Sequence, residues 1–354
     1  MDPLRAPAQG AAAAPAGAEE EAGRGPAPVY DVAVVGGGPA GLFATFYAGL
    51  RGMRVVLIEA AAQLGGQPAL VYPEKWIYDV AGFPRVRGRE LAERLIEQAL
   101  RFDPEVRLGT RALHLEDTGT GVYDLSLSDG SVLPVRGVIV AAGLGAFQPK
   151  RLPAPGIDRW EGRGLMYGVQ RLDDLRGKRV VIVGGGDAAV DWALMAVEVA
   201  ASVTLVHRRR QFRALEESVR ELQASPVRLE LAAEVVAAEG GDVLERVHVA
   251  SKETGEIKVL DCDVLVPCLG FKADLGTLAG WGFQVQGNEI VAEPHGATAL
   301  PRVYAIGDVA RYPGKIKLIT VAFAEAAMAV SHLKTELDPG AALQPAHSSE
   351  LKLG

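Results

Sequence analysis

Two glycine-rich turns, each preceded by a short apolar run, carry the residues of this sequence best suited to binding a phosphate group. The pattern residues are Gly36, Gly38 and Gly41 in the first turn, and Gly184, Gly186 and Asp187 in the second. Glycines permit a tight turn and a close approach of the backbone to a pyrophosphate, which the free N–H groups of the next helix then stabilise. Each turn therefore predicts a dinucleotide site.

The residues that follow the two turns differ in charge. Glu59 lies eighteen residues after Gly41, and His207 lies eighteen residues after Ala189, which ends the second turn. An acid at this position accepts hydrogen bonds from a ribose 2′-hydroxyl, whereas a basic cluster suits a 2′-phosphate. The basic residues assigned to that phosphate are His207, Arg208, Arg209 and Arg213. A basic run is also typical of a solvated surface, but the planar guanidinium fork and this position favour NADP(H) at the second turn.

The elements around both turns must place them at the edge of a sheet. Residues 32–35, 42–50 and 54–58 read as strand, helix and strand, and residues 175–205 repeat that unit. The sequence therefore predicts an α/β fold with two Rossmann-like dinucleotide-binding domains, the second inserted in the first. We expect a disordered tail at 1–28, an FAD-binding domain at 29–149 and 286–354, and an NADP-binding domain at 150–285.

Two further segments carry residues that suit a flavin. The loop over 63–84 is rich in Gly, Pro and aromatic residues, so it is either a packed surface loop or a wall for a flat ring, with Tyr72 stacked on it. Asp308 ends a short apolar strand, where it either approaches a ribityl chain or caps the helix expected around 319–330. Together with the first turn, Asp308 favours FAD.

Composition excludes several other functions. The net charge of -7 gives no basic signature for nucleic acid, and no apolar run is long enough to span a bilayer. Cys262 and Cys268 are the only cysteines, and six residues of strand hold them too far apart for a disulfide. We expect a cytoplasmic protein with structural thiols, no metal site, no membrane contact and no nucleic-acid partner.

From Tyr30 onward the sequence resembles the thioredoxin-reductase-like flavoproteins, but it contains no Cys-x-x-Cys. It is most similar to their ferredoxin/flavodoxin–NADP+ reductase branch, in the tracts 64–84, 186–194, 207–209 and 344–349. The resemblance implies a homodimer in which the tail of one subunit covers the flavin of the other, with Tyr72 and His347 on opposite faces of the ring. By position, it also implies FAD contacts from Glu59, Gln67, Ala112, Phe147, Asp308 and Ser349.

The expected activity is electron transfer between NADPH and ferredoxin or flavodoxin, by hydride transfer to the flavin followed by single-electron steps. Ferredoxins are typically acidic, and Lys75, Arg85, Arg87 and Arg89 are candidates for docking one, although they also fit a solvated basic face. Three alternatives stay open at this level. The chain could reduce small acceptors such as quinones or free flavin, it could be a non-catalytic FAD/NADP-binding sensor, and residues 338–354 could be a frayed end.

Overall fold

The computed structural model describes residues 28–143, 145, 148–169, 171–272 and 274–345, and it divides into two compact units. The first unit comprises Met1–Ala69, Trp76–Ala146 and Ala273–Gly354, and the second comprises Leu70–Lys75 and Phe147–Lys272. Both units have a parallel sheet covered by helices, which confirms the predicted α/β fold. In the described ranges, no helix has the length and apolarity needed to cross a membrane.

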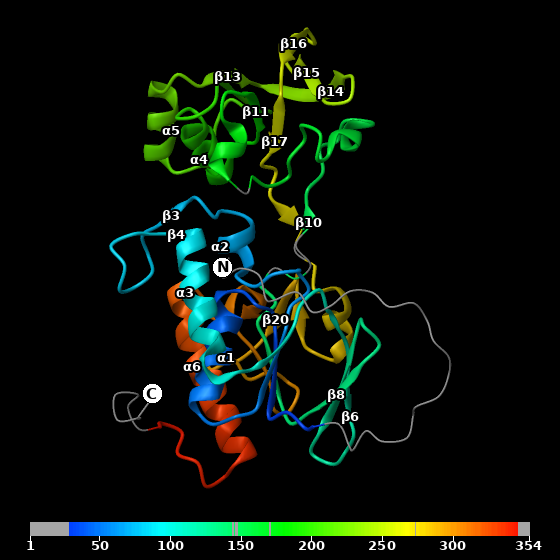
Figure 1. Cartoon of the computed structure of the whole chain (residues 1–354), viewed down its shortest axis with the longest axis vertical. Coiled ribbons are helices and arrows are strands. Elements are labelled where there is room, and N and C mark those ends of the chain that lie inside the picture. Colours follow the sequence, from blue (N-terminus) through cyan, green and yellow to red (C-terminus); the bar gives the residue numbers. More distant parts are fainter. Residues whose placement is uncertain (1–27, 144, 146–147, 170, 273, 346–354) are drawn as a thin grey trace. The chain divides into compact units, whose positions relative to one another are not determined.

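The first unit is built on a five-stranded parallel sheet in the order β21–β9–β1–β2–β5 (Figure 1). Its strands are β1 (Val32–Val35), β2 (Val55–Ile58), β5 (Glu105–Arg107), β9 (Val138–Val140) and β21 (Val303–Ala305). Every residue of β1, β2, β9 and β21 is buried, as the runs of apolar residues in these strands require for a sheet covered on both faces.

Helices cover one face of this sheet, and a second sheet covers the other. The helices are α1 (Pro39–Leu50), α3 (Gly88–Ala99) and α6 (Ile319–Leu337), with α1 packed against both others. The second sheet is antiparallel and contains β6 (Ala112–Asp117), β7 (Tyr123–Leu127) and β8 (Val132–Val135). Ala33 and Val35 of β1 share a core cluster with Leu125 and Leu127 of β7, so alternate strand residues face the antiparallel sheet.

Short elements complete the first unit around the edge of its sheet. They are α2 (Gly66–Leu70), the hairpin β3 (Trp76–Ile77) and β4 (Val86–Arg87), the 3-10 helices Leu100–Phe102, Gly276–Trp281 and Gly307–Val309, and a small sheet of β19 (Val285–Gln286), β20 (Glu289–Val291) and β22 (Ala310–Arg311).

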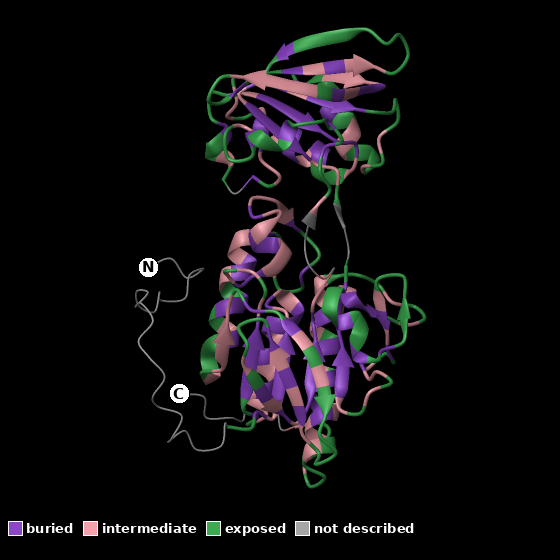
Figure 2. Ribbon diagram, turned by 90° about the vertical axis from the view of Figure 1, so that its right-hand side faces the viewer, coloured by how far each residue is buried: buried purple, intermediate pink, exposed green. Residues whose placement is uncertain are grey.

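The second unit repeats this layering on a smaller scale. Its parallel sheet, in the order β13–β12–β11–β17, contains β11 (Arg179–Val183), β12 (Ser202–His207), β13 (Arg228–Leu231) and β17 (Val264–Pro267). Val180 and Ile182 share a core cluster with residues of α4 (Asp187–Ala196) and with Leu222 of α5 (Glu216–Ala224). Val181 and Val183 instead share one with β14 (Ala233–Gly240), β15 (Leu244–Ser251) and β16 (Ile257–Asp261), which form an antiparallel sheet. Figure 2 shows the buried strands at the centre of each unit.

The second unit is an insertion whose two ends pair with each other. Strand β10 (Gln148–Pro149) and strand β18 (Phe271–Lys272) form an antiparallel ladder. We expected the inserted segment to extend to residue 285, but the chain returns to the first unit after residue 272. The reason is that Trp281 and Phe283 are buried in the core of the first unit, where the Trp281 indole N–H donates to the Leu113 carbonyl at 3.0 Å.

Candidate functional site: two dinucleotide-binding turns

The first glycine turn joins β1 to α1 with almost no space for side chains. A Cβ on Gly36, whose φ is 112°, would lie 2.4 Å from the Ala141 carbonyl oxygen. A Cβ on Gly41 would lie 1.8 Å from the Gly36 carbonyl oxygen. Only glycine therefore fits at both positions, and the turn presents bare backbone at the start of α1, as a bound pyrophosphate requires.

Glu59 follows β2 directly and reaches back to this turn. One carboxylate oxygen accepts the Gly37 N–H at 2.6 Å, and the other accepts the Ala61 N–H at 2.7 Å. Burial raises the pKa of Glu59 above its usual value, although these backbone hydrogen bonds oppose the shift. The carboxylate is therefore fixed beside the turn, at the position predicted for a ribose contact.

Three other predicted contact residues, Gln67, Ala112 and Asp308, lie on segments that border this turn. Gln67 is in α2, and a Cβ on its neighbour Gly66 would lie 2.6 Å from the Gly38 Cα. Ala112 begins β6, two residues after Thr110, whose N–H donates to the Glu59 carbonyl at 3.0 Å.

Asp308 reaches the same region through Gly307. A Cβ on Gly307 would lie 3.1 Å from the Ala40 Cβ at the start of α1. Helix α6 begins with no side-chain cap, so the alternative role of Asp308 as its N-cap is wrong.

The second glycine turn joins β11 to α4 and is more open than the first. A Cβ on Gly186 would meet nothing within 4 Å, whereas a Cβ on Gly184 would lie 2.6 Å from the Cys268 carbonyl oxygen. Asp187 is the first residue of α4, and its carboxylate accepts the Leu215 N–H at 3.0 Å. Asp187 therefore ties the start of α4 to the end of the loop that carries the basic residues.

His207 ends β12, and its side chain packs against the second glycine turn. Its ring is stacked on Phe212, and a Cβ on Gly185 would lie 2.1 Å from the ring. His207 is only 7% exposed, and burial lowers its pKa, which the neighbouring arginine charges lower further. An uncharged, buried imidazole positions the loop and does not itself present positive charge to a phosphate.

The arginines after β12 fall into two groups. Arg210 forms a bidentate pair with Glu253, at 2.8 and 2.6 Å. The exposed guanidinium groups of Arg208, Arg209 and Arg213 have no hydrogen bond or ion pair within the part of the chain that the structure describes. The Arg213 backbone N–H donates to the Gly185 carbonyl at 2.7 Å, which fixes this residue beside the turn. The three arginines assigned to the 2′-phosphate are therefore the three without an acidic partner.

Some predicted site residues cannot be placed at a site. Phe147, His347 and Ser349 lie outside the described residues. Tyr72 belongs to Leu70–Lys75, which groups with the second unit. Lys75, a docking candidate, pairs with Asp191 of α4 at 2.5 Å, which lowers its value as a free positive charge.

The structure also gives roles to residues that the sequence interpretation passed over. Arg51, just after α1, donates to the carbonyls of Ala342 at 2.6 Å and Leu343 at 2.9 Å, and so holds the segment after α6. Glu325 of α6 is buried against the loop that carries Asp308. No local pattern marks either contact, because each joins residues far apart in the sequence.

The cysteines cannot form a dithiol centre. Both are free, and burial raises the pKa of Cys262 and that of Cys268 to about 12. The thiolate is the reactive form of cysteine, so neither thiol is a nucleophile at neutral pH. The expectation of structural thiols agrees with this geometry.

Comparison with known proteins defines the class. The family model "Pyridine nucleotide-disulphide oxidoreductase" matches residues 30–326, and the chain belongs to this family. A solved thioredoxin reductase from T. acidophilum is similar in structure, with a TM-score of 0.75 at 25% identity, covering 87% of this chain and 99% of that one.

Curated relatives narrow the class further. The chain is 47% identical over 329 residues to a protein of Geobacillus thermodenitrificans named ferredoxin–NADP reductase, covering 91% of this chain and 97% of the relative. It is 44% identical over 326 residues to one of the same name from Symbiobacterium thermophilum, covering 91% and 97%. The family resemblance inferred from the motifs is confirmed.

Proposed function

We propose that this chain is an FAD-dependent oxidoreductase that transfers electrons between NADPH and ferredoxin or flavodoxin. The main observation behind the proposal is that the two glycine turns are followed by residues of opposite charge. Glu59 lies beside the first turn, and arginines without an acidic partner in the described residues follow the second. The names of the curated relatives support ferredoxin as the partner. Because the sequence has no Cys-x-x-Cys and the pKa of both thiols is raised to about 12, the proposed electron path does not include a dithiol.

The residues of the chain bind and position the cofactors. When bound, FAD supplies a ring that accepts a hydride from NADPH and releases electrons singly, so no side-chain general base is needed. The first turn and Glu59 hold the adenosine end of FAD, while Gln67, Ala112 and Asp308 border the same site. Arg208, Arg209 and Arg213 bind the 2′-phosphate of NADP(H), and His207 and Asp187 hold their loop against the second turn.

The working form is a homodimer in which Tyr72 and His347 flank the flavin, with Phe147 and Ser349 as further contacts. Arg51 supports a dimer in which each C-terminal tail contacts the other subunit. It binds Leu343 at the C-terminal end of α1, whereas the first glycine turn lies at the N-terminal end of that helix. Four extended residues reach from Leu343 to His347 and cover at most about 14 Å, whereas α1 alone is about 18 Å long. This short reach favours the proposal that the tail contacts the flavin of a second copy.

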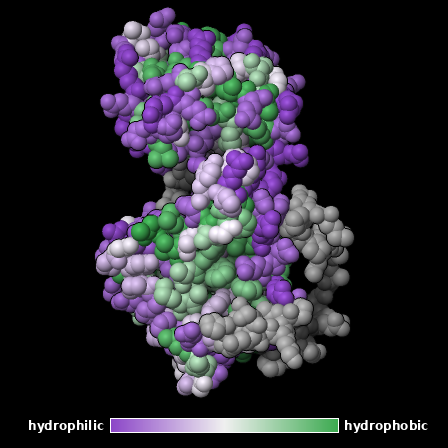
Figure 3. Space-filling model, turned by 90° about the vertical axis from the view of Figure 1, so that its left-hand side faces the viewer, coloured by the Kyte–Doolittle hydropathy of each residue, from purple (hydrophilic) through white to green (hydrophobic). Residues whose placement is uncertain are grey.

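An aromatic surface on α1 supports the same dimer. Phe43, Phe46 and Tyr47 follow helical spacing and are all only partly buried, and the Phe43 ring contacts the other two. Phe43 also contacts Phe323, and Phe46 contacts Phe102. Figure 3 shows apolar side chains gathered on the helix-covered face of the first unit. Exposed apolar area of this kind favours burial against another protein surface.

This dimer is testable by light scattering. Phe43→Glu should yield monomers, while Tyr78→Glu, at a tyrosine that is 66% exposed, should leave the dimer intact. A dimeric Phe43→Glu variant would contradict the proposed interface.

The hairpin β3–β4 is the proposed docking surface for the acidic partner. The Trp76 ring contacts the guanidinium groups of Arg85, at 4.4 Å from the ring centroid, and Arg87, at 4.7 Å, and Arg89 follows at the start of α3. The ring contacts hold the guanidinium groups of Arg85 and Arg87 at the surface of the hairpin, and a cluster of basic side chains suits docking of an acidic protein. The protein is proposed to work in the cytoplasm, where NADPH is available.

Acceptor competition tests the function. Stopped-flow mixing of the flavin-loaded protein with NADPH should bleach the flavin absorbance, and turnover should be faster with ferredoxin or flavodoxin than with quinone or free flavin. Arg85→Ala should raise the KM for ferredoxin several-fold and leave ferricyanide reduction unchanged. Arg176→Ala, at an exposed arginine paired with Asp173, is the matched control. Equal rates with ferredoxin and quinone would point to a small-acceptor reductase, and an unbleached flavin would point to a sensor.

A further inference from the structure

One buried carboxylate ties the loop after β21 to helix α6. Glu325 is 1% exposed and accepts three donors from that loop. One oxygen accepts the Gly307 N–H at 2.8 Å, and the other accepts the Tyr312 hydroxyl and the Lys315 ammonium group. A single side chain of α6 therefore fixes three points of the segment 307–315.

The donor set matches a carboxylate, which accepts hydrogen bonds at both of its oxygens. All three partners donate hydrogen bonds, and the Lys315 side chain is itself only 6% exposed. Burial, reinforced by the adjacent carboxylate, holds the pKa of Tyr312 well above its usual value, so its hydroxyl remains a donor. Removing one partner of such a buried pair is costly, because the other group is left without water or a partner.

The held loop borders the first glycine turn. Gly307 lies against Ala40 at the start of α1, and Asp308 follows Gly307 directly. The N–H that Glu325 binds is thus one residue from the side chain assigned to FAD. A shift of this loop moves Asp308 relative to the turn.

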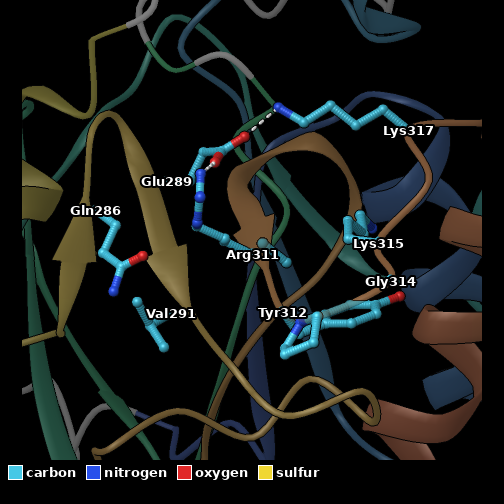
Figure 4. A pocket seen from close by; sticks show the side chains of 10 residues that line it. Gln286, Glu289, Val291, Arg311, Tyr312, Gly314, Lys315 and Lys317 are labelled. Atoms are coloured by element: carbon cyan, nitrogen blue, oxygen red, sulfur yellow. Dashed lines mark hydrogen bonds and ion pairs between the residues drawn. The ribbon is translucent and has the colours of Figure 1, made fainter.

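A second glutamate holds the same loop from its outer side. Glu289 of β20 pairs with Arg311 at 2.8 Å and with Lys317 (Figure 4). These residues line a cavity of about 640 Å³ together with Tyr312 and Lys315. Arg311 and Lys317 thus bind Glu289, whereas Tyr312 and Lys315, which lie between them in the sequence, bind Glu325.

We propose that Glu325, with Lys315 and Tyr312, is a positioning residue for FAD: it sets the distance between Asp308 and the first glycine turn. This inference rests on the FAD of the proposed function. It predicts that FAD affinity depends on Glu325, while NADP+ affinity, which depends on the second unit, does not.

The test is FAD titration of the full-length apoprotein, followed by quenching of flavin fluorescence. Glu325→Gln should raise the FAD dissociation constant at least tenfold, because it leaves the Lys315 ammonium without its partner, and should leave the NADP+ dissociation constant within twofold. Adding Lys315→Met to Glu325→Gln should recover at least threefold of the loss. At saturating FAD, the visible circular dichroism of Glu325→Gln should differ from that of the wild type, because the flavin environment has moved.

Tyr312→Phe is the milder variant, and it decides the question if Glu325→Gln does not fold. It removes one hydrogen bond and keeps both charges, so it should raise the FAD dissociation constant about three- to tenfold. Tyr304→Phe is the matched control, because Tyr304 donates to Glu336 near the far end of α6 and does not contact the loop. Its FAD dissociation constant should stay within twofold of wild type.

Two results would overturn the inference. One is wild-type FAD affinity in folded Tyr312→Phe, and the other is an equal loss in Tyr304→Phe. A wild-type protein that binds no FAD would instead refute the proposed function, so the two failures are distinguishable.

Discussion

The two glycine turns share one pattern, but they use the residue after the second strand in different ways. At the first turn, Glu59 is itself the predicted ligand group, and its carboxylate already contacts the turn. At the second turn, the buried ring of His207 packs against Gly185, and the predicted ligand groups are the arginines that follow it in the chain. At the first turn, the residue after the second strand is therefore itself the predicted ribose contact. At the second turn, the residue at the same position instead holds the loop that carries the predicted phosphate contacts. Holding the loop in place reduces what is lost on binding, because long arginine side chains lose conformational freedom when they bind.

The largest difference in stability between the two turns is expected from substitutions at the last residue of each glycine pattern, Gly41 in the first turn and Ala189 in the second. Gly41→Ala would force a Cβ to 1.8 Å from the Gly36 carbonyl, so the backbone must move. We expect a loss of more than about 3 kcal/mol in the free energy of unfolding, together with loss of FAD binding. The second turn already has alanine at the matching position, Ala189. Ala189→Gly should cost only about 1 kcal/mol, its helix propensity, and chemical denaturation of both variants compares the turns directly.

Next in size is the loss of NADPH selectivity. Charge-assisted hydrogen bonds are each worth about 1.5–3 kcal/mol, so Arg208→Ala combined with Arg209→Ala should reduce kcat/KM for NADPH by about 100-fold or more. The value for NADH should change less than threefold. Arg210→Ala is the control within the same run, because its guanidinium is already paired with Glu253. Equal losses of kcat/KM for NADPH and NADH would contradict the assignment of the second turn to NADP(H).

The smallest effect concerns the pH dependence of Glu59. Burial raises its pKa in the folded apoprotein above the value in the unfolded chain. Its contribution to stability is therefore fully present below the unfolded pKa and is lost as pH rises through the folded pKa. Glu59→Gln should flatten this part of the curve of apoprotein stability against pH, as measured by urea unfolding from pH 4 to 7.

The same variant links stability to ligand binding. Glu59→Gln should weaken FAD binding about tenfold, because the amide presents one acceptor where the carboxylate presents two. A Glu59→Gln variant with wild-type FAD affinity and a wild-type pH profile of stability would contradict the assignment of Glu59 to the ribose.

Local patterns predicted the strand–turn–helix units well. Residues 32–35 and 54–58, expected as strands, correspond to β1 and β2, because an apolar run beside a glycine turn has few other stable conformations. The choice of Arg208, Arg209 and Arg213 over Arg210 also agrees with the pairing in the structure.

Long-range contacts could not be predicted in this way. The end of the insertion was placed too late because no local pattern assigns Trp281 and Phe283 to the first unit, where they share a core cluster with residues of β6 and β7. The role of Glu325 depends on an interior that only the folded chain creates, and its partners have no helical or strand spacing to it.

The raised pKa of both cysteine thiols has a chemical consequence for a protein proposed to carry electrons. With the pKa of each thiol raised to about 12, only about one thiol in 100,000 is ionised at pH 7. Reduced flavins exposed to oxygen generate peroxide, and peroxide attacks thiolates. Cys262, which is fully buried, is therefore shielded from such an oxidant, and alkylating reagents should leave it unmodified until the second unit unfolds.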